Sequence, residues 1–323
     1  MRYRLFRPLD IEVSTVGFGT WALGGEGRFA GRQLGWGPTD FAEASRAIRC
    51  AVDSGVNFFD TADLYGNGAA ERLLGETIGS NENVVVCTKF GNREDSSGAG
   101  FQDFSAPWLR ASVEGSLKRL RRARLDVVLL HSPPDDFDFA RYDTTVLADL
   151  VKEGKVGCFG VSCRSARGAE RVLAARLGTV VEVIYNAVDR RSAAKVLPEA
   201  DRSGVAVIAR VPLASGFLAG TYEARPSFFP STDYRSGLPT AELEWRTEAA
   251  NKLAFLARLP GGMAVSALRF CLSHAAVTTV ATGMRKVEHV ESNVLASDLG
   301  PLEADDLRRI EEAVPTVFEG WAA

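Results

Sequence analysis

Short apolar runs alternate with amphipathic stretches along most of this chain. Runs such as 84–87 and 127–130 are apolar at every position. Such runs are typical of parallel strands that are covered on both faces. Between them, apolar residues return at helical spacing, as Phe41, Ala44 and Ile48 do. The pattern therefore predicts buried strands that alternate with helices.

Eight strand–helix units follow a short N-terminal hairpin in this interpretation. The hairpin strands are expected at 4–5 and 11–13, and the core strands at 16–19, 56–59, 84–89, 127–131, 158–161, 180–184, 205–209 and 278–281. The helices are expected at 41–54, 69–78, 105–120, 144–152, 166–176, 192–202, 241–257, 263–273, 287–294 and 303–313. Long loops are expected at 24–38, 90–104, 133–139 and 212–239.

Eight such units close most economically into a (β/α)8 barrel, the TIM-barrel fold, as one domain over residues 1–323. A doubly wound open sheet is the alternative. It would carry a third glycine in the phosphate-binding turn after its first strand, but Gly17-Phe18-Gly19 is followed by Ala22. The length of 323 residues would also allow two domains, but no linker divides the pattern.

Charge and cysteine content argue against several classes of protein. The net charge is −3, and the basic cluster at 118–124 falls at the expected end of a helix, where cations are favoured. No apolar stretch approaches the roughly 18 residues of a membrane helix, and residues 1–8 lack a signal-peptide pattern. The five cysteines are scattered, as free thiols in a reducing cytosol are. We expect a cytoplasmic protein without nucleic-acid or membrane partners.

Ionisable side chains follow three successive strands. Asp60 and Tyr65 follow one strand, Lys89 ends the next, and His131 ends the one after. A nearby ammonium lowers the pKa of a phenol because it favours the phenolate. Asp60 could balance that ammonium, and His131 could hydrogen-bond a carbonyl oxygen. Together these residues form an acid–base constellation that could protonate an alkoxide as it forms.

Each of these residues also has a structural interpretation. Asp60 could cap the strand, Tyr65 could be a surface aromatic, and His131 could be a satisfied structural histidine. Lys89 is harder to explain in this way, because a lysine directly after a buried strand needs a partner. Their joint occurrence at successive strand ends favours catalysis.

The same segments carry a resemblance to a known family. The chain resembles the aldo-keto reductase superfamily at 17–21, 57–66, 88–89, 130–132, 160–162, 185–186, 212–220 and 283–293, in the family's order and over nearly the whole chain. The resemblance implies a barrel that reduces aldehydes or ketones with NADPH. It implies that Tyr65 is the general acid, tuned by Lys89 and Asp60. His131 would orient the carbonyl, and the nicotinamide would supply the hydride.

The resemblance further implies a set of cofactor contacts. They are Gly19, Thr20, Trp21, Asp60, Ser162, Cys163, Glu182, Arg210, Pro212, Leu213, Ser215, Gly216, Leu218, Gly283, Met284, Arg285, His289 and Asn293. At the helix start after Gly283, N–H groups and the helix dipole favour a phosphate. The Arg285 guanidinium suits the 2′-phosphate of NADP. A solvated helix start is the alternative, but a cation there opposes the dipole.

Two positions depart from the family pattern. Ser162 matches a serine that binds the carboxamide, but Cys163 replaces an asparagine that often follows it, and Glu182 replaces a glutamine. Glu182 could accept a hydrogen bond from the amide and favour a positively charged ring, or it could form a salt bridge inside the barrel mouth. Arg210 stands where relatives carry a stacking aromatic or an arginine, and an ordinary ion pair is its alternative.

The expected substrate is a small carbonyl compound whose identity stays open. Candidate walls of its site are Trp21, Phe29, Trp36, Tyr65, Phe101, Phe104 and Trp108. Aromatic walls favour an apolar or ring-shaped ligand. The acidic run at 135–138 adds a sugar or polyol as an alternative. A sugar or sugar-nucleotide ketoreductase or dehydrogenase of the same family thus stays open, as do the direction of reaction and the oligomeric state.

Two alternatives come from other classes of protein. A redox-sensing regulatory subunit would bind NADPH with little turnover, as some relatives do as partners of membrane proteins, but the intact tetrad favours an enzyme. A metal-dependent barrel hydrolase would need clustered ligands, whereas His131, His274 and His289 are far apart in the sequence. We expect no metal site.

Overall fold

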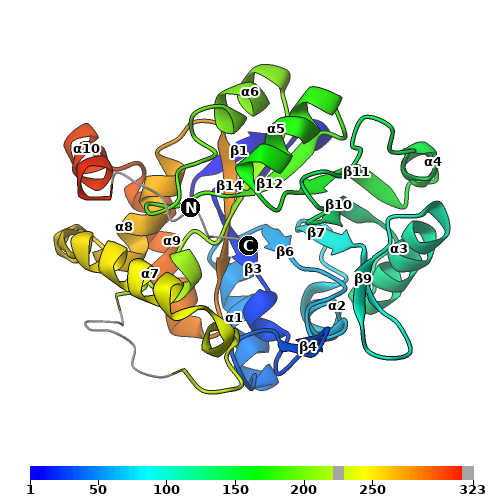
Figure 1. Ribbon diagram of the computed structural model, residues 1–323, viewed down its shortest axis with the longest axis horizontal. Coiled ribbons are helices and arrows are strands. Elements are labelled where there is room, and N and C mark those ends of the chain that lie inside the picture. Colours follow the sequence, from blue (N-terminus) through cyan, green and yellow to red (C-terminus); the bar gives the residue numbers. More distant parts are fainter. Residues whose placement is uncertain (221–228, 315–323) are drawn as a thin grey trace.

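The central sheet is a closed barrel of parallel strands (Figure 1). The structure, a computed structural model, describes residues 1–220 and 229–314. In this part of the chain the barrel strands are β3 (Val16–Gly19), β6 (Phe58–Asp60), β7 (Val85–Phe90), β10 (Leu125–His131), β11 (Val156–Ser162), β12 (Val180–Ile184), β13 (Ala206–Arg210) and β14 (Val277–Gly283). They close in the order β10-β11-β12-β13-β14-β3-β6-β7. The expected (β/α)8 barrel is confirmed, and the open sheet is excluded.

Helices surround the barrel (Figure 1). The described helices are α1 (Phe41–Asp53), α2 (Ala69–Ile78), α3 (Ala106–Leu120), α4 (Thr145–Lys152), α5 (Ala166–Ala175), α6 (Val196–Ser203), α7 (Thr240–Lys252), α8 (Gly262–Leu272), α9 (Val287–Leu299) and α10 (Ala304–Ala313). The start of α1 is set by Asp40, which accepts hydrogen bonds from the N–H groups of Ala42 and Glu43, as an N-cap does. Within the described ranges, no helix has the length and apolar character that crossing a membrane requires.

A hairpin closes the N-terminal end of the barrel. Its strands, β1 (Tyr3–Phe6) and β2 (Ile11–Ser14), pair antiparallel, as expected. Phe6 and Val13 are fully buried against the side chains that fill the barrel, and the rings of Phe6 and Phe58 lie 6.0 Å apart. With this end sealed, the opposite end, where the strands have their C-termini, is left for a site.

Two expected helices differ from those observed. The helix expected at 241–257 ends at Lys252, and a 3-10 turn follows it, because Leu253 and Leu256 both turn into the core.

The helix expected at 192–202 begins only at Val196. Ser192 Oγ donates instead to the carbonyl oxygen of Ile184, 3.1 Å away. A short hydroxyl side chain that bonds to nearby backbone in this way competes with helix formation.

Two of the expected loops contain short hairpins that the pattern did not predict. In the loop at 24–38, β4 (Arg28–Phe29) pairs with β5 (Arg32–Gln33). After β7, β8 (Asn92–Glu94) pairs with β9 (Gly100–Gln102). These strands are short and largely polar, so they give no apolar signal in the sequence. Part of the loop expected at 212–239, residues 221–228, lies outside the described residues.

The strand ends bring the four candidate catalytic residues to one end of the barrel. Asp60 is the last residue of β6, His131 is the last of β10, and Lys89 is next to last in β7. Tyr65 lies in the loop between β6 and α2. Because neighbouring strands are parallel, their C-terminal ends open on the same side.

Candidate active site

The centre of the site is the buried ammonium group of Lys89, whose residue is 1% exposed. Its Nζ lies 2.5 Å from Asp60 Oδ1 and donates to the carbonyl oxygen of Thr61 at 3.1 Å. A second carboxylate oxygen, Glu182 Oε2, lies 3.2 Å from the same Nζ. Burial alone would lower the pKa of Lys89, but the two carboxylates outweigh it and hold that pKa well above its usual value. The ammonium therefore stays charged.

The Tyr65 hydroxyl lies beside this ammonium, with its oxygen 3.3 Å from Lys89 Nζ. The turn that carries Tyr65 passes very close to the turn after β3. Gly66 has a φ of 58°, and a Cβ there would lie 2.0 Å from the carbonyl oxygen of Gly24. Glycine alone allows this approach, which brings the Tyr65 ring to 5.9 Å from the ring of Trp21.

Burial keeps the Tyr65 phenol protonated. It raises the pKa of Tyr65 well above its usual value, by more than the Lys89 ammonium lowers it. The lowering that the sequence suggested is present but is outweighed. A protonated phenol next to an ammonium gives up its proton only to a strongly basic acceptor.

His131 faces Tyr65 edge-on, with the ring centroids 5.9 Å apart. Burial, and then the charges of Lys89 and Arg210, hold the pKa of His131 well below its usual value, so the imidazole is neutral. Its Nδ1 is buried and has no hydrogen-bond partner within residues 1–220 and 229–314. Buried polar atoms are normally paired, so this nitrogen indicates a place for a ligand atom.

Asp60, Cys87 and Glu182 have the spacing of metal ligands, with one donor atom of each within 4.8 Å of the others. The Lys89 ammonium already forms ion pairs with both carboxylates. This ammonium supplies the positive charge that a metal ion would bring.

Several other buried polar atoms near this centre form no hydrogen bond with the described residues. They are Thr20 Oγ1, Trp21 Nε1, Arg210 Nε and Thr282 Oγ1. Thr20 and Trp21 follow β3, Arg210 ends β13, and Thr282 is next to last in β14. Together with His131 Nδ1 they form a partial ring of unsatisfied donors and acceptors at the C-terminal end of the barrel. Such a ring is what a polar, elongated ligand would satisfy.

The two departures from the family pattern both lie in buried surroundings. Glu182 contacts Lys89, and its Oε1 also lies 3.9 Å from Arg210 Nε. The salt-bridge alternative for Glu182 is therefore present, as is the ion-pair alternative for Arg210. Arg210 also donates to the carbonyl oxygen of Cys163 at 3.1 Å. The Cys163 thiol donates a hydrogen bond to the carbonyl oxygen of Val161.

The loop after β13 has a strained backbone. Val211, Ala214 and Ser215 have φ values of 55°, 49° and 59°, a region that residues other than glycine rarely adopt. The predicted cofactor contacts of this loop are Pro212, Leu213, Ser215, Gly216 and Leu218. Strain of this kind gathers at functional sites, which is consistent with a ligand-binding loop.

The groups predicted to bind a phosphate at the start of α9 form hydrogen bonds within the chain. The Arg285 guanidinium donates to the carbonyl oxygens of Trp36 and Pro38, at 2.9 and 2.7 Å. The N–H of Val287 donates to the Glu43 carboxylate at 3.1 Å, so an acidic side chain already lies at this helix N-terminus.

The other predicted contacts at α9 differ in exposure. Met284 is fully buried, Asn293 is buried and His289 is exposed. His289 Nδ1 accepts a hydrogen bond from the N–H of Arg285 at 3.2 Å.

The predicted aromatic walls do not form one continuous surface. Trp21 and Trp36 both pack on Tyr234, with ring centroids 5.4 and 5.7 Å away. Tyr234 was missed because it lies in a long loop with no strand end beside it. Trp108, by contrast, stacks on the guanidinium of Arg93 at 4.0 Å.

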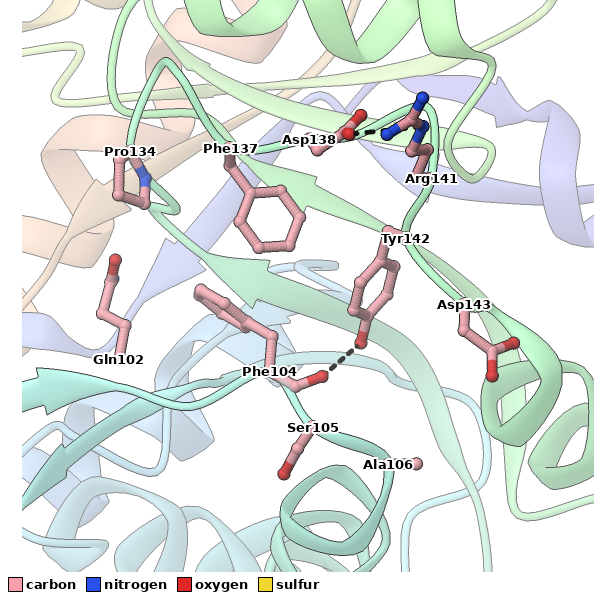
Figure 2. Close-up of a pocket in the computed structure, with 10 residues that line it drawn as sticks. All are labelled: Gln102, Phe104, Ser105, Ala106, Pro134, Phe137, Asp138, Arg141, Tyr142 and Asp143. Atoms are coloured by element: carbon pink, nitrogen blue, oxygen red, sulfur yellow. Dashed lines mark hydrogen bonds and ion pairs between the residues drawn. The ribbon is translucent and has the colours of Figure 1, made fainter.

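Phe104, another predicted wall, lines an open groove of about 590 Å³ beside the barrel mouth (Figure 2). Phe104, Phe137 and Tyr142 form its aromatic floor, and the Tyr142 hydroxyl donates to the carbonyl oxygen of Phe104. Gln102 connects the groove to the site, because its amide donates to the carbonyl oxygen of His131 at 3.0 Å. Of this set the sequence indicated only Phe104 as a wall.

Comparison with known proteins agrees with this geometry. The model of the Aldo/keto reductase family matches residues 15–315. The aldo-keto reductase YhdN of Bacillus subtilis is 28% identical over 322 residues, which cover 97% of this chain and 94% of that protein. The structure of the aldo-keto reductase AKR11C1 from Bacillus halodurans in its holo form has a TM-score of 0.79 and 26% identity, and 99% of each chain is covered. The glycerol dehydrogenase AKR11B4 from Gluconobacter oxydans also has a TM-score of 0.79, with 27% identity over 99% of this chain and 98% of that one.

The chain belongs to the aldo/keto reductase family. The resemblance that the motifs indicated is confirmed, and the protein is an oxidoreductase of this family.

The carboxyl group of Asp63, two residues before Tyr65, should make the stability of the folded protein depend on pH. Its Oδ2 accepts a hydrogen bond from Ser112 at 2.8 Å, whereas its Oδ1 is buried without a partner. Burial, and then repulsion from Glu71, raises the pKa of Asp63 from 3.8 to about 7. Because the folded state binds this proton more tightly than the unfolded state, the contribution of Asp63 to stability is lost as pH rises from about 4 to about 7.

The Asp63→Asn variant removes this titration. Relative to the variant, the wild type should lose up to about 4 kcal/mol of stability between pH 4 and pH 8, since one pKa unit is worth about 1.4 kcal/mol. Urea unfolding of both proteins across this range measures the difference. A gap that does not change with pH would contradict the assignment.

Proposed function

We propose that this protein transfers hydride between a nicotinamide cofactor, NADP(H), and a small aldehyde or ketone, with Tyr65 as the general acid in reduction. The observation that carries the proposal is the arrangement at Lys89. A charged, buried ammonium lies 3.3 Å from a protonated phenol, and the ring of a neutral histidine lies 5.9 Å from the phenol ring. These groups suit the oxygen of a carbonyl that becomes an alkoxide.

The side chains have distinct tasks in this reaction. A bound nicotinamide would supply the hydride, which side chains cannot do. Tyr65 would donate its proton to the developing alkoxide oxygen, and the Lys89 ammonium would stabilise the phenolate that results. Neutral His131 would donate a hydrogen bond to the same oxygen and orient it. Asp60 would hold Lys89 in place through their contact of 2.5 Å.

The residues present fit a dinucleotide. The unpaired atoms of Thr20, Trp21, Arg210 and Thr282 lie at neighbouring strand ends, and the strained loop after β13 continues the same rim. The start of α9, with Arg285 beside it, would receive a phosphate at the far end. Members of the family typically use a nicotinamide cofactor, and one solved neighbour is described as a holo form.

The substrate would enter across the aromatic surfaces near Tyr65. Trp21 packs on Tyr65, and Tyr234 packs on Trp21. The groove lined by Phe104, Phe137 and Tyr142 (Figure 2) would reach the site through Gln102, which bonds to His131. Such walls suit a compound with an apolar or ring-shaped part. One neighbour of similar fold is a glycerol dehydrogenase, so alcohol oxidation is part of the proposed chemistry.

Replacement of Tyr65 by Phe tests the proposed acid. The variant keeps the ring but removes the transferable proton, so turnover should fall about 10²- to 10⁴-fold, the usual share of general acid catalysis. Cofactor binding, followed by tryptophan fluorescence, should stay within about twofold. Turnover is measured with a panel of aldehydes, ketones and keto-sugars.

Tyr142→Phe is the matched control, because it removes a phenol hydroxyl that donates to the carbonyl oxygen of Phe104 in the groove. It should retain the chemical step. Equal loss in the two variants, or full activity in Tyr65→Phe, would remove Tyr65 from the mechanism.

Replacement of Arg285 by Ala tests the choice of NADP over NAD. Charge-assisted hydrogen bonds to a phosphate contribute about 1.5–3 kcal/mol, so the affinity for NADPH should fall about 10- to 100-fold. The affinity for NADH, which lacks the 2′-phosphate, should change little. An equal loss for both cofactors would show that Arg285 only ties down the Trp36–Pro38 segment.

A further inference from the structure

The Glu182 side chain is an additional charge at the centre of the site. It lies on β12, where it pairs in register with Ser162 of β11. It is 1% exposed, and its Oε2 lies 3.2 Å from Lys89 Nζ. Although the ion pair is close, this oxygen accepts no hydrogen bond from the part of the chain that the structure describes. Glu182 therefore acts mainly through its negative charge, since the Lys89 ammonium donates its short hydrogen bond to Asp60.

The position of Glu182 relative to the reacting atoms follows from Lys89. The hydroxyl oxygen of Tyr65 and a carboxylate oxygen of Glu182 both lie in contact with the same Nζ, at 3.3 and 3.2 Å. A carbonyl oxygen that accepts the Tyr65 proton through a hydrogen bond of ordinary length therefore lies within about 10 Å of this Glu182 oxygen. A ring that passes hydride to the carbonyl carbon must touch that carbonyl, so it lies within range of the Glu182 charge in a poorly screened site.

The charges in this part of the barrel balance. The cations are Lys89 and Arg210, and the carboxylates are Asp60 and Glu182, linked by contacts of 2.5, 3.2 and 3.9 Å. Without the Glu182 charge, two cations would share one carboxylate. A reduced nicotinamide ring is neutral and an oxidised ring is positive, so the oxidised ring would then meet an uncompensated positive charge in a poorly screened site.

We propose that Glu182 sets the relative affinity of this site for the two redox states of its cofactor, and that its carboxylate favours the oxidised, positively charged ring. The inference rests on the proposed function, because it needs a nicotinamide in contact with the carbonyl. It gives the Glu182 charge a consequence for function beyond its ion pairs. Tighter binding of the oxidised cofactor shifts the equilibrium on the enzyme toward NADP⁺ and alcohol, which is the direction of carbonyl reduction.

The test compares dissociation constants of NADP⁺ and NADPH for the wild type and for Glu182→Gln, by tryptophan fluorescence without substrate. Glutamine has the shape of glutamate without the charge. Burial and repulsion from Glu182 raise the pKa of Asp60 to about 7. The measurement is therefore made at pH 8.5, where Asp60 is ionised in both proteins. The ratio of the NADP⁺ constant to the NADPH constant should rise about tenfold, the effect of one charge several ångströms away at a moderate effective dielectric constant.

Arg210→Gln is the opposite-sign control. It removes a positive charge next to Glu182, so the same ratio should fall. A purely structural disturbance would weaken both redox states alike and would not give opposite signs in the two variants.

The outcomes separate this inference from the proposed function. If both cofactors bind the wild type and the ratio is unchanged in Glu182→Gln, the inference is wrong while the proposed function stands. If neither NADP⁺ nor NADPH binds the wild type, and NAD⁺ and NADH do not bind either, both are wrong. If only NAD⁺ and NADH bind, the same ratio is measured with that pair.

Discussion

The burial of one ammonium group, that of Lys89, is the constraint on which the rest of the site depends. An isolated charge at 1% exposure would be very costly, and the barrel offsets that cost with carboxylates from two other strands and the carbonyl oxygen of Thr61. Removing one partner of such a buried pair typically costs about 3–5 kcal/mol. The ion pairs thus link β6, β7 and β12 at the end of the barrel opposite the hairpin.

The same burial acts differently on each neighbour of Lys89. It keeps the Tyr65 phenol protonated and the His131 imidazole neutral, while the carboxylates keep the lysine charged. In the proposed reduction these are the states that each group needs: an acid with a proton, a neutral hydrogen-bond donor and a fixed cation. One closed barrel therefore prepares three different side chains.

The sequence predicted the parts of the molecule that depend on local pattern. Apolar runs marked the strands, and residues at their ends, such as Lys89 and His131, could be assigned to one side because parallel strands share a direction. Tyr234 and Gln102 were missed because they lie in long loops. No hydrophobic periodicity in the sequence indicates that these loops return to the site. The partners of Arg285 are backbone carbonyls of a distant loop, and a carbonyl group has no sequence signal at all.

The most direct test of this account is the rate of hydride transfer in a single turnover of the Lys89→Met variant. Enzyme saturated with NADPH is mixed with a reactive aromatic aldehyde, and cofactor oxidation is followed by stopped-flow absorbance, with NADPH binding as the check that the variant is folded. Loss of the ammonium should slow the step at least about 100-fold, because the phenolate formed at Tyr65 loses its stabilising charge. A folded, NADPH-binding variant that reacts within about twofold of the wild-type rate would contradict the central role of Lys89.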